Sequence, residues 1–349
     1  MDFELNFKPL LKLKSGDKVA ILSPSFAAPG LYPSVFELGL LRLKEVFKLE
    51  PVEYPTTRKV GATKEERAND LIRAFQNKEI KAVIASIGGD DQVTYIKGLP
   101  KEPFVNNPKV FLGYSDSTNF MNFLWLNGIP SYYGGSVMTQ LAMQQQMDDY
   151  TIKYMKHALF DDGEFEIIQS KAFNEIGLDW GDESNLQKHR YYEPNQGWFW
   201  SGECDVQGIS WGGCLESIDE ILRHGNAIPA LEQFENVILM IETCEEISSA
   251  TFVFRVFRAL GERGILGRIK ALLVGRAKAW EFDKPFSEGE RNAHRQKQME
   301  TIVECVRMFG KAAPIVQNID FGHTDPQIAF PYGATVRVLS SSKQIFAKF

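Results

Sequence analysis

The sequence predicts an α/β protein of two domains: an N-terminal doubly wound parallel sheet, then a mixed α/β domain with a β-rich end. Its 349 residues exceed what one hydrophobic core usually organises. Apolar, strand-like runs alternate with amphipathic stretches through the first half, and residues 161–200 break that alternation. We therefore expect an N-terminal domain at 1–162, a linker and long loop at 163–200, and a C-terminal domain at 201–349.

The predicted elements of the first half follow one another as strand and helix. The strands are apolar throughout, which is typical of a parallel sheet covered by helices on both faces. The expected strands are KVAILSPS (18–25), KAVIASIGG (81–89) and VFLGYSD (110–116), and the expected helices are LYPSVFELGLLRLKEVF (31–47), KEERANDLIRAFQN (64–77) and STNFMNFLWLNG (117–128).

The second half resumes after a segment of mixed charge, DWGDESNLQKHRYYEPNQGWFW, which is too aromatic for plain disorder and too long for a simple connection. The end of the second half is rich in strand-like runs. The expected helices are GGCLESIDEILRHG (212–225) and SSATFVFRVFRALGERG (248–264), and the expected strands are NVILMIETCE (236–245), IKALLVGRAKA (269–279), PIVQNIDFGHT (314–324), TVRVLSS (335–341) and QIFAKF (344–349).

Composition excludes several classes of protein. The net charge of -6, with dispersed basic residues, offers no surface for a run of phosphates, so we expect no nucleic acid polymer as partner. The four cysteines lack a C-x-x-C pair, which predicts buried, reduced thiols rather than a zinc site or a disulfide framework. No apolar run approaches the roughly 18 residues of a spanning helix. We expect a cytoplasmic protein without a membrane partner.

Two turns made of small residues contain candidate catalytic groups. GYSDS has the G-x-S-x-small pattern of a nucleophile elbow, in which a strand turns abruptly into a helix and exposes a serine oxygen. Ser115 is thus a candidate nucleophile, although Ser115 or Asp116 could instead cap an ordinary helix. In SIGGDDQ an amide of Gly88 or Gly89 can reach the same sheet edge as an oxyanion donor. Such a turn also cradles phosphate in kinases, but no Lys-Ser/Thr pair follows it.

A serine nucleophile needs a base and an acid that orients the base. Of the five histidines, His323 in NIDFGHTDP follows an apolar strand and precedes a Thr-Asp-Pro turn, a position that favours a catalytic group held by a rigid scaffold. The other four lie in polar or helix-terminal stretches. Glu242 ends the apolar run NVILMIE, so its carboxylate would emerge where a buried strand ends, whereas we expect Glu245 and Glu246 to be solvated.

Five motifs, GYSDST, SIGGDDQ, GGCLES, IETCEE and FGHTDP, occur in this order across nearly the whole chain, which resembles the LD-carboxypeptidase and microcin C immunity family of serine peptidases. The resemblance implies a Ser-His-Glu peptidase in which Ser115 is the nucleophile and the C-terminal domain supplies Glu242 and His323 across a cleft. It also implies an oxyanion hole from the backbone amides of Gly89 and Asp116, a homodimer, and no metal or organic cofactor.

Three positions depart from the family pattern or suggest a branch. Ile87-Gly88-Gly89 stands where muropeptide-cleaving members have Arg-Gly-Gly and looks more like the microcin-immunity branch. Trp180 would match the tryptophan with which that branch stacks on a nucleobase, or it only anchors its loop against the core. Cys214 replaces the asparagine of the family's GGN. The resemblance implies a small peptide substrate, either a muropeptide ending in D-alanine or a peptidyl or aminoacyl nucleotide of the microcin type.

Two other functions stay open on the sequence alone. The SIGGDD turn could belong to a nucleotide-binding or phosphoryl-transfer protein, which would depend on magnesium. The chain could also be an inactive module that keeps the fold and binds peptidoglycan fragments without cutting them.

Overall fold

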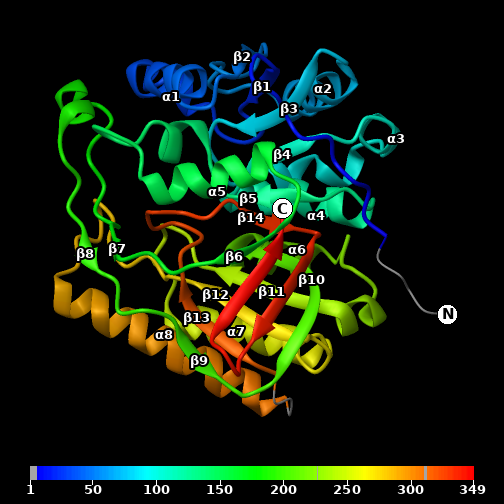
Figure 1. Cartoon of the computed structure of the whole chain (residues 1–349), viewed down its shortest axis with the longest axis vertical. Coiled ribbons are helices and arrows are strands. Elements are labelled where there is room, and N and C mark those ends of the chain that lie inside the picture. The colour runs from blue at the N-terminus through cyan, green and yellow to red at the C-terminus, as the bar shows by residue number, and fades with distance from the viewer. Residues whose placement is uncertain (1–5, 226, 310–312) are drawn as a thin grey trace.

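The computed structural model describes residues 6–225, 227–309 and 313–349, whose strands form two large sheets and a two-stranded ribbon. The N-terminal half supplies most of a six-stranded sheet, which lies in the upper part of Figure 1. All neighbouring strands run parallel except β14, which is antiparallel to β5. The order is β14 (Phe330–Tyr332), β5 (Ser131–Tyr133), β4 (Val110–Gly113), β3 (Ile80–Ala85), β1 (Lys18–Leu22) and β2 (Glu50–Glu53).

Helices lie against this sheet, as a doubly wound layer requires. α2 begins with a capping box, in which Thr63 and Glu66 each bind the backbone amide of the other. The predicted strands of this half match β1, β3 and β4, and the predicted helices match α1, α2 and α4. The helices are α1 (Pro33–Glu45), α2 (Lys64–Gln76), α3 (Glu102–Val105), α4 (Thr118–Leu126) and α5 (Asp149–Phe160).

The C-terminal half forms an eight-stranded mixed sheet. Four central strands, β10 to β13, run parallel, and the flanking strands run antiparallel to their neighbours. Two flanking strands, β6 and β9, come from the predicted linker. The order is β6 (Glu164–Ile167), β16 (Gln344–Lys348), β15 (Thr335–Leu339), β10 (Asp205–Cys214), β11 (Val237–Glu242), β12 (Ala271–Gly275), β13 (Ile315–Ile319) and β9 (Phe199–Ser201).

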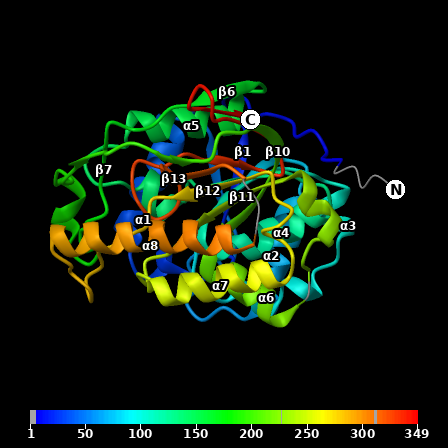
Figure 2. The ribbon, with the colours of Figure 1, turned by 90° about the horizontal axis from the view of Figure 1, so that it is seen from below.

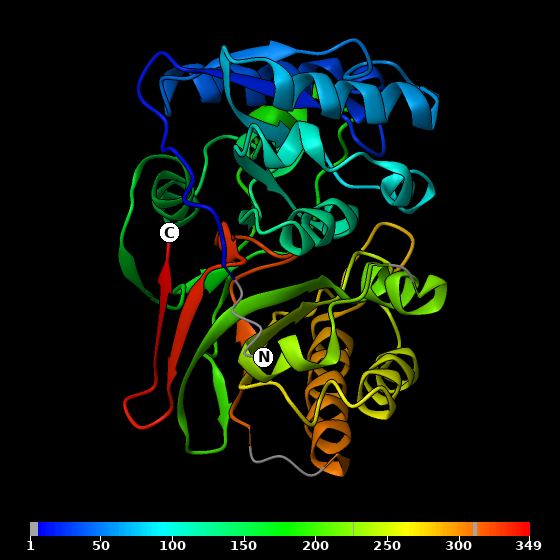
Figure 3. The same cartoon turned by 90° about the vertical axis from the view of Figure 1, so that its right-hand side faces the viewer.

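Three helices, α6 (Leu215–His224), α7 (Ala250–Glu262) and α8 (Glu288–Met308), accompany this sheet. Figure 3 shows them together on one side of the lower half, with the red strands β15 and β16 at the other side. Figure 2 shows α7 and α8 lying side by side. α6 and α7 match predicted helices, whereas the 21-residue α8 lies outside every predicted element. No helix in the described ranges is both long and apolar enough to cross a membrane.

The chain crosses between the two sheets at residues 320–329. This segment leaves β13 in the second sheet and enters β14 in the first, where Phe330 pairs with Tyr133. The crossing segment carries His323 and brings it beside the N-terminal sheet. The two-domain α/β class is therefore confirmed, while the exact boundaries at 162 and 200 stay predictions. The ribbon, β7 (Ala172–Phe173) with β8 (Glu193–Pro194), brackets the segment that carries Trp180.

Candidate active site

Ser115 lies on a strained turn at the carboxyl end of β4. Its φ is +60°, in the left-handed region, and it begins a short 3-10 turn that leads into α4. A non-glycine residue in this region costs of order 1–3 kcal/mol, and such strain is common at functional sites. Gly113 is required here because a Cβ at that position would lie 2.7 Å from Oγ of Ser117. The geometry is that of a nucleophile elbow.

The helix-cap interpretation of this turn does not fit the contacts. α4 has Ser117 at its N-cap, without a side-chain bond from that residue to the helix. The buried carboxylate of Asp116 instead accepts the backbone N–H groups of Asp91 and Gln92, each at 3.0 Å, and a bond from Asn119 at 2.8 Å. Burial raises the pKa of Asp116. Asp116 thus ties the glycine-rich turn to the elbow.

The glycine pair packs directly against Ser115. A Cβ on Gly88 would lie 2.8 Å from Cβ and 3.0 Å from Oγ of Ser115, and one on Gly89 would lie 2.3 Å from Oγ of Ser25. Gly89 also has a φ of +140°, which side chains rarely tolerate. The turn continues into a 3-10 helix of only three residues, Gln92–Thr94, rather than the long helix N-terminus that phosphate cradles use.

His323 and Glu242 meet beneath the elbow. Nδ1 of His323 lies 2.7 Å from Oε2 of Glu242, whose carboxylate is fully buried at the end of β11. Gly322 makes room for this contact, because a Cβ there would lie 2.5 Å from the same oxygen. The ring of Tyr114 packs edge-on against the imidazole at 5.0 Å between centroids. The two residues predicted from separate motifs are therefore in direct contact.

Glu245 is exposed to solvent, as predicted, but it also makes a contact that the sequence did not indicate. Its side chain is 53% exposed, but its Oε2 lies 3.0 Å from Nε2 of His323. Burial opposes a charged imidazole, yet Glu242 and Glu245 together raise the pKa of His323 well above its ordinary value. Partial burial would raise the pKa of Glu245. The charge of His323 outweighs this effect and lowers the pKa of Glu245 to about 2.

Tyr133 is a site residue that the sequence did not indicate. Its buried hydroxyl accepts the backbone N–H of Ser115 at 3.1 Å and donates to Oε1 of Glu242 at 2.5 Å. Burial and the Glu242 charge raise the pKa of Tyr133 far above its ordinary value, so the hydroxyl stays a donor. Tyr133 thereby links the elbow of one domain to the acid of the other.

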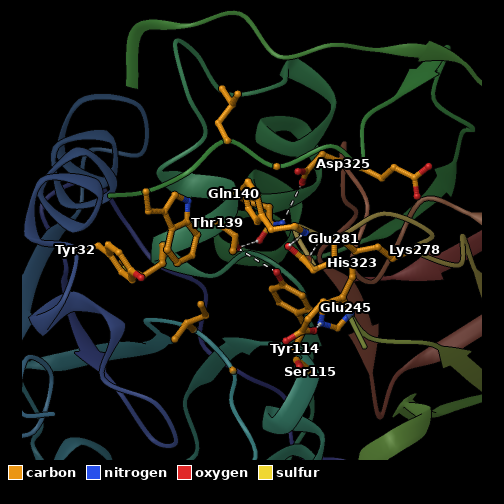
Figure 4. A pocket seen from close by; sticks show the side chains of 18 of the residues that line it. Tyr32, Tyr114, Ser115, Thr139, Gln140, Glu245, Lys278, Glu281, His323 and Asp325 are labelled. Carbon is orange, nitrogen blue, oxygen red and sulfur yellow. Dashed lines mark hydrogen bonds and ion pairs between the residues drawn. The ribbon is translucent and has the colours of Figure 1, made fainter. Parts of the chain in front are cut away.

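Several residues of the site border a cavity of about 480 Å³ (Figure 4). Gly88, Gly89, Ser115, Trp180 and His323 line it, whereas Asp116 and Glu242 lie behind the lining. Figure 4 shows the labelled Ser115, Glu245 and His323 close together at one end, with Tyr32 across the cavity. The rings of Trp180 and Tyr32 meet edge-on, with 5.6 Å between their centroids, and this contact holds the loop of Trp180 in place. Trp180 also faces the cavity.

Thiols and a carboxylate that could hold a metal ion lie beside Glu242. Cys214 is paired with Glu242 in the register of β10 and β11, and its Sγ donates to Oε2 of Glu216 at 3.1 Å. All four cysteines are free, and Cys204 alone among them is exposed. The prediction of reduced, mostly buried thiols is therefore confirmed.

Two family models match the chain: the LD-carboxypeptidase N-terminal domain over residues 19–134 and the LD-carboxypeptidase C-terminal domain over residues 207–338. The chain belongs to the LD-carboxypeptidase family. A protein of Treponema pallidum, provisionally named a carboxypeptidase, is 26% identical, with 97% of this chain and 94% of that protein covered. The microcin C7 self-immunity protein MccF of Escherichia coli is 24% identical, with 97% and 95% covered.

Solved structures have the fold of this LD-carboxypeptidase family member. An MccF-like protein from Streptococcus pneumoniae, solved in complex with AMP, has a TM-score of 0.83 and 25% identity, and the match covers 96% of this chain and 99% of that one. MccF in complex with glutamyl sulfamoyl guanosine has a TM-score of 0.84 and 21% identity, with 97% and 98% covered. The predicted family and the predicted two-domain fold are confirmed.

Proposed function

We propose that this protein is a serine-type carboxypeptidase that hydrolyses an amide near the carboxyl end of a small peptide. Ser115, His323 and Glu242 form its triad. The observation that carries the proposal is the 2.7 Å contact between Nδ1 of His323 and buried Glu242, beside a strained Ser115 that lines the same cavity as the imidazole. A carboxylate at Nδ1 fixes the imidazole tautomer and directs Nε2 toward the nucleophile.

The reaction begins with a proton transfer that the resting contacts oppose. Nε2 of His323 faces Glu245, so the half-exposed Glu245 side chain must turn away before Nε2 accepts the Ser115 proton. Oγ of Ser115 then attacks the carbonyl carbon, and the amides of Gly89 and Asp116 stabilise the oxyanion. His323 gives its proton to the leaving amine, and water attacks the resulting acyl-enzyme by the same route.

The aromatic lining of the cavity supports a substrate that carries a nucleobase. Phe26, Tyr32, Trp180 and Phe282 all border it, and flat aromatic rings stack on bases of any sequence. Relatives of this chain were solved with sulfamoyl nucleosides or AMP in place. We therefore favour an aminoacyl or peptidyl nucleotide of the microcin type over a muropeptide. The homodimer and the cytoplasmic location stay predictions.

Parallel hydrolysis assays test this proposal. Wild-type protein and Ser115→Ala are each incubated with a tetrapeptide muropeptide and with an aminoacyl sulfamoyl adenosine, and products are followed by mass spectrometry. The proposal expects wild type to cut at least one substrate and Ser115→Ala to cut neither. It fails if both substrates remain intact with wild type, or if the alanine variant cuts equally well. Binding of muropeptide without cleavage would identify an inactive binding module instead.

A further inference from the structure

β10 and β11 lie side by side (Figure 1), and two thiols and a carboxylate converge where these strands end. Cys214 ends β10, Glu216 lies in the first turn of α6, and Cys244 follows β11. One ligand atom from each residue lies within 4.8 Å of the other two. Within the ranges that the structure describes, this is the one group of three such donors with that spacing. Both thiols are buried and free, and Glu216 is half-buried.

The spacing suits a tetrahedral metal ion. Sγ of Cys214 lies 3.1 Å from Oε2 of Glu216. Metal–sulfur distances of about 2.3 Å and metal–oxygen distances of about 2.1 Å place S and O about 3.6 Å apart, and two S atoms about 3.8 Å apart, in a tetrahedral zinc site. The three donors therefore need only small shifts to surround one cation.

Neighbouring groups already orient the carboxylate. Oε1 of Glu216 accepts the hydroxyl of Ser248 at 2.5 Å, and Oε2 accepts the backbone N–H of Cys244 at 3.2 Å. Such bonds from groups other than the ligand atoms hold a metal ligand in place, and their loss typically weakens metal binding. The β10–β11 pairing fixes Cys214 in the same way. The donors are thus held by the fold before any cation arrives.

We propose that Cys214, Glu216 and Cys244 bind one divalent cation of borderline softness, such as Zn²⁺ or Co²⁺. Two thiolates with one carboxylate match the preference of these ions and not that of Mg²⁺ or Ca²⁺, which select oxygen. Binding displaces the two thiol protons to solvent, and water takes the fourth position on the half-exposed side of Glu216. The inference does not depend on the peptidase function proposed above.

Cobalt titration of the full chain tests the site without any enzyme assay. The protein is kept reduced with a phosphine, so that no disulfide forms, and Co²⁺ is added while the absorption spectrum is recorded. We expect thiolate-to-cobalt charge-transfer bands and tetrahedral ligand-field bands that saturate at one equivalent and disappear when Zn²⁺ is added. Their absence from the wild-type spectrum would overturn the proposal before any variant is made.

Cysteine variants locate the ion. Cys214→Ala and Cys244→Ala are each expected to lose the bands, and Glu216→Gln is expected to bind Co²⁺ more weakly with both thiolates retained. Matched controls are Cys305→Ala, which removes a buried thiol in α8, and Cys204→Ala, which removes the exposed one. Bands that survive in Cys214→Ala and Cys244→Ala, or that vanish in Cys204→Ala, would contradict the assignment. Circular dichroism confirms that each variant is folded.

Discussion

Nε2 of His323 lies 3.0 Å from Oε2 of Glu245, while its other ring nitrogen contacts Glu242. Burial lowers the pKa of this imidazole, but the two carboxylates outweigh burial and raise it well above its ordinary value, so the resting contacts favour the protonated ring. A protonated histidine cannot accept the proton of Ser115. Glu245 therefore opposes the first step of the proposed reaction.

Glu245→Gln is expected to shift the acid limb of kcat/KM toward lower pH. Removing the Glu245 charge lowers the pKa of His323, so a larger fraction of the imidazole is neutral at any pH on that limb. Activity profiles from pH 5 to 9 measure the shift. Glu246→Gln, which removes an exposed neighbouring charge, is the control and should leave the profile in place. A Glu245→Gln profile that superposes on wild type would contradict this role.

Tyr133→Phe is expected to lower kcat more than it raises KM. The variant removes the hydroxyl that binds both the Ser115 amide and the Glu242 carboxylate, so the elbow and the acid lose their common anchor. Leaving buried groups without this partner costs about 1–3 kcal/mol of unfolding free energy. Urea denaturation and steady-state kinetics measure the two effects.

Tyr132→Phe is the matched control for that variant. Tyr132 is the adjacent residue of β5 and its hydroxyl accepts a bond from Lys12, but Lys12 also donates to the carbonyl of Ala158. The lysine therefore keeps a partner in the variant, and kcat should not change. Equal losses of kcat in the two variants would show that Tyr133 acts only through general packing.

Gly88→Ala is expected to reduce kcat/KM by on the order of a hundredfold, because a small displacement of a reacting group has about that effect. The added methyl carbon would lie 2.8 Å from Cβ of Ser115, so one of the two residues must move. Gly98→Ala is the control, since a Cβ there meets nothing within 4 Å. Near wild-type activity in Gly88→Ala would show that the turn does not constrain the nucleophile.

Trp180→Ala is expected to lower kcat/KM about tenfold to a hundredfold for the aminoacyl nucleotide, as loss of one stacked base commonly does. Muropeptide cleavage, if present, should change little. Trp198→Ala is the matched control, because Trp198 belongs to the same predicted linker, 163–200, but lies outside the cavity lining. A parallel fall for both substrates, with a lower melting temperature, would indicate that Trp180 only supports its loop through Tyr32.

The elements that the sequence predicted have either the apolar period of a helix or a continuous apolar run. β11 is buried at every position, and its apolar run ends at the acid that it positions. α8 was missed because part of its buried face is polar: Arg291 and Arg295 both pair with the buried carboxylate of Glu175 instead of packing against apolar side chains. A search for apolar residues at helical spacing therefore misses the polar part of this inward face.

The residues of the candidate site also fall into those that local sequence predicts and those that it does not. Ser115, Glu242 and His323 each follow an apolar run, so their positions could be predicted from local sequence. Tyr133 and Glu245 acquire their contacts only through tertiary structure, because Tyr133 of the first sheet binds Glu242 of the second, and Glu245 meets His323 from a distant part of the chain. The group of Cys214, Glu216 and Cys244 could not be predicted either, because Cys244 joins the other two only through the folding of the chain.

Covalent labelling tests the central claim most directly. The protein is treated with a fluorophosphonate, which phosphonylates activated serines, and the modified residue is identified by peptide mass spectrometry. The account predicts one adduct, on Ser115, that is absent from Ser115→Ala and forms much more slowly in His323→Ala. An unmodified Ser115, or an adduct on another serine, in wild-type protein that cleaves its substrate would contradict it.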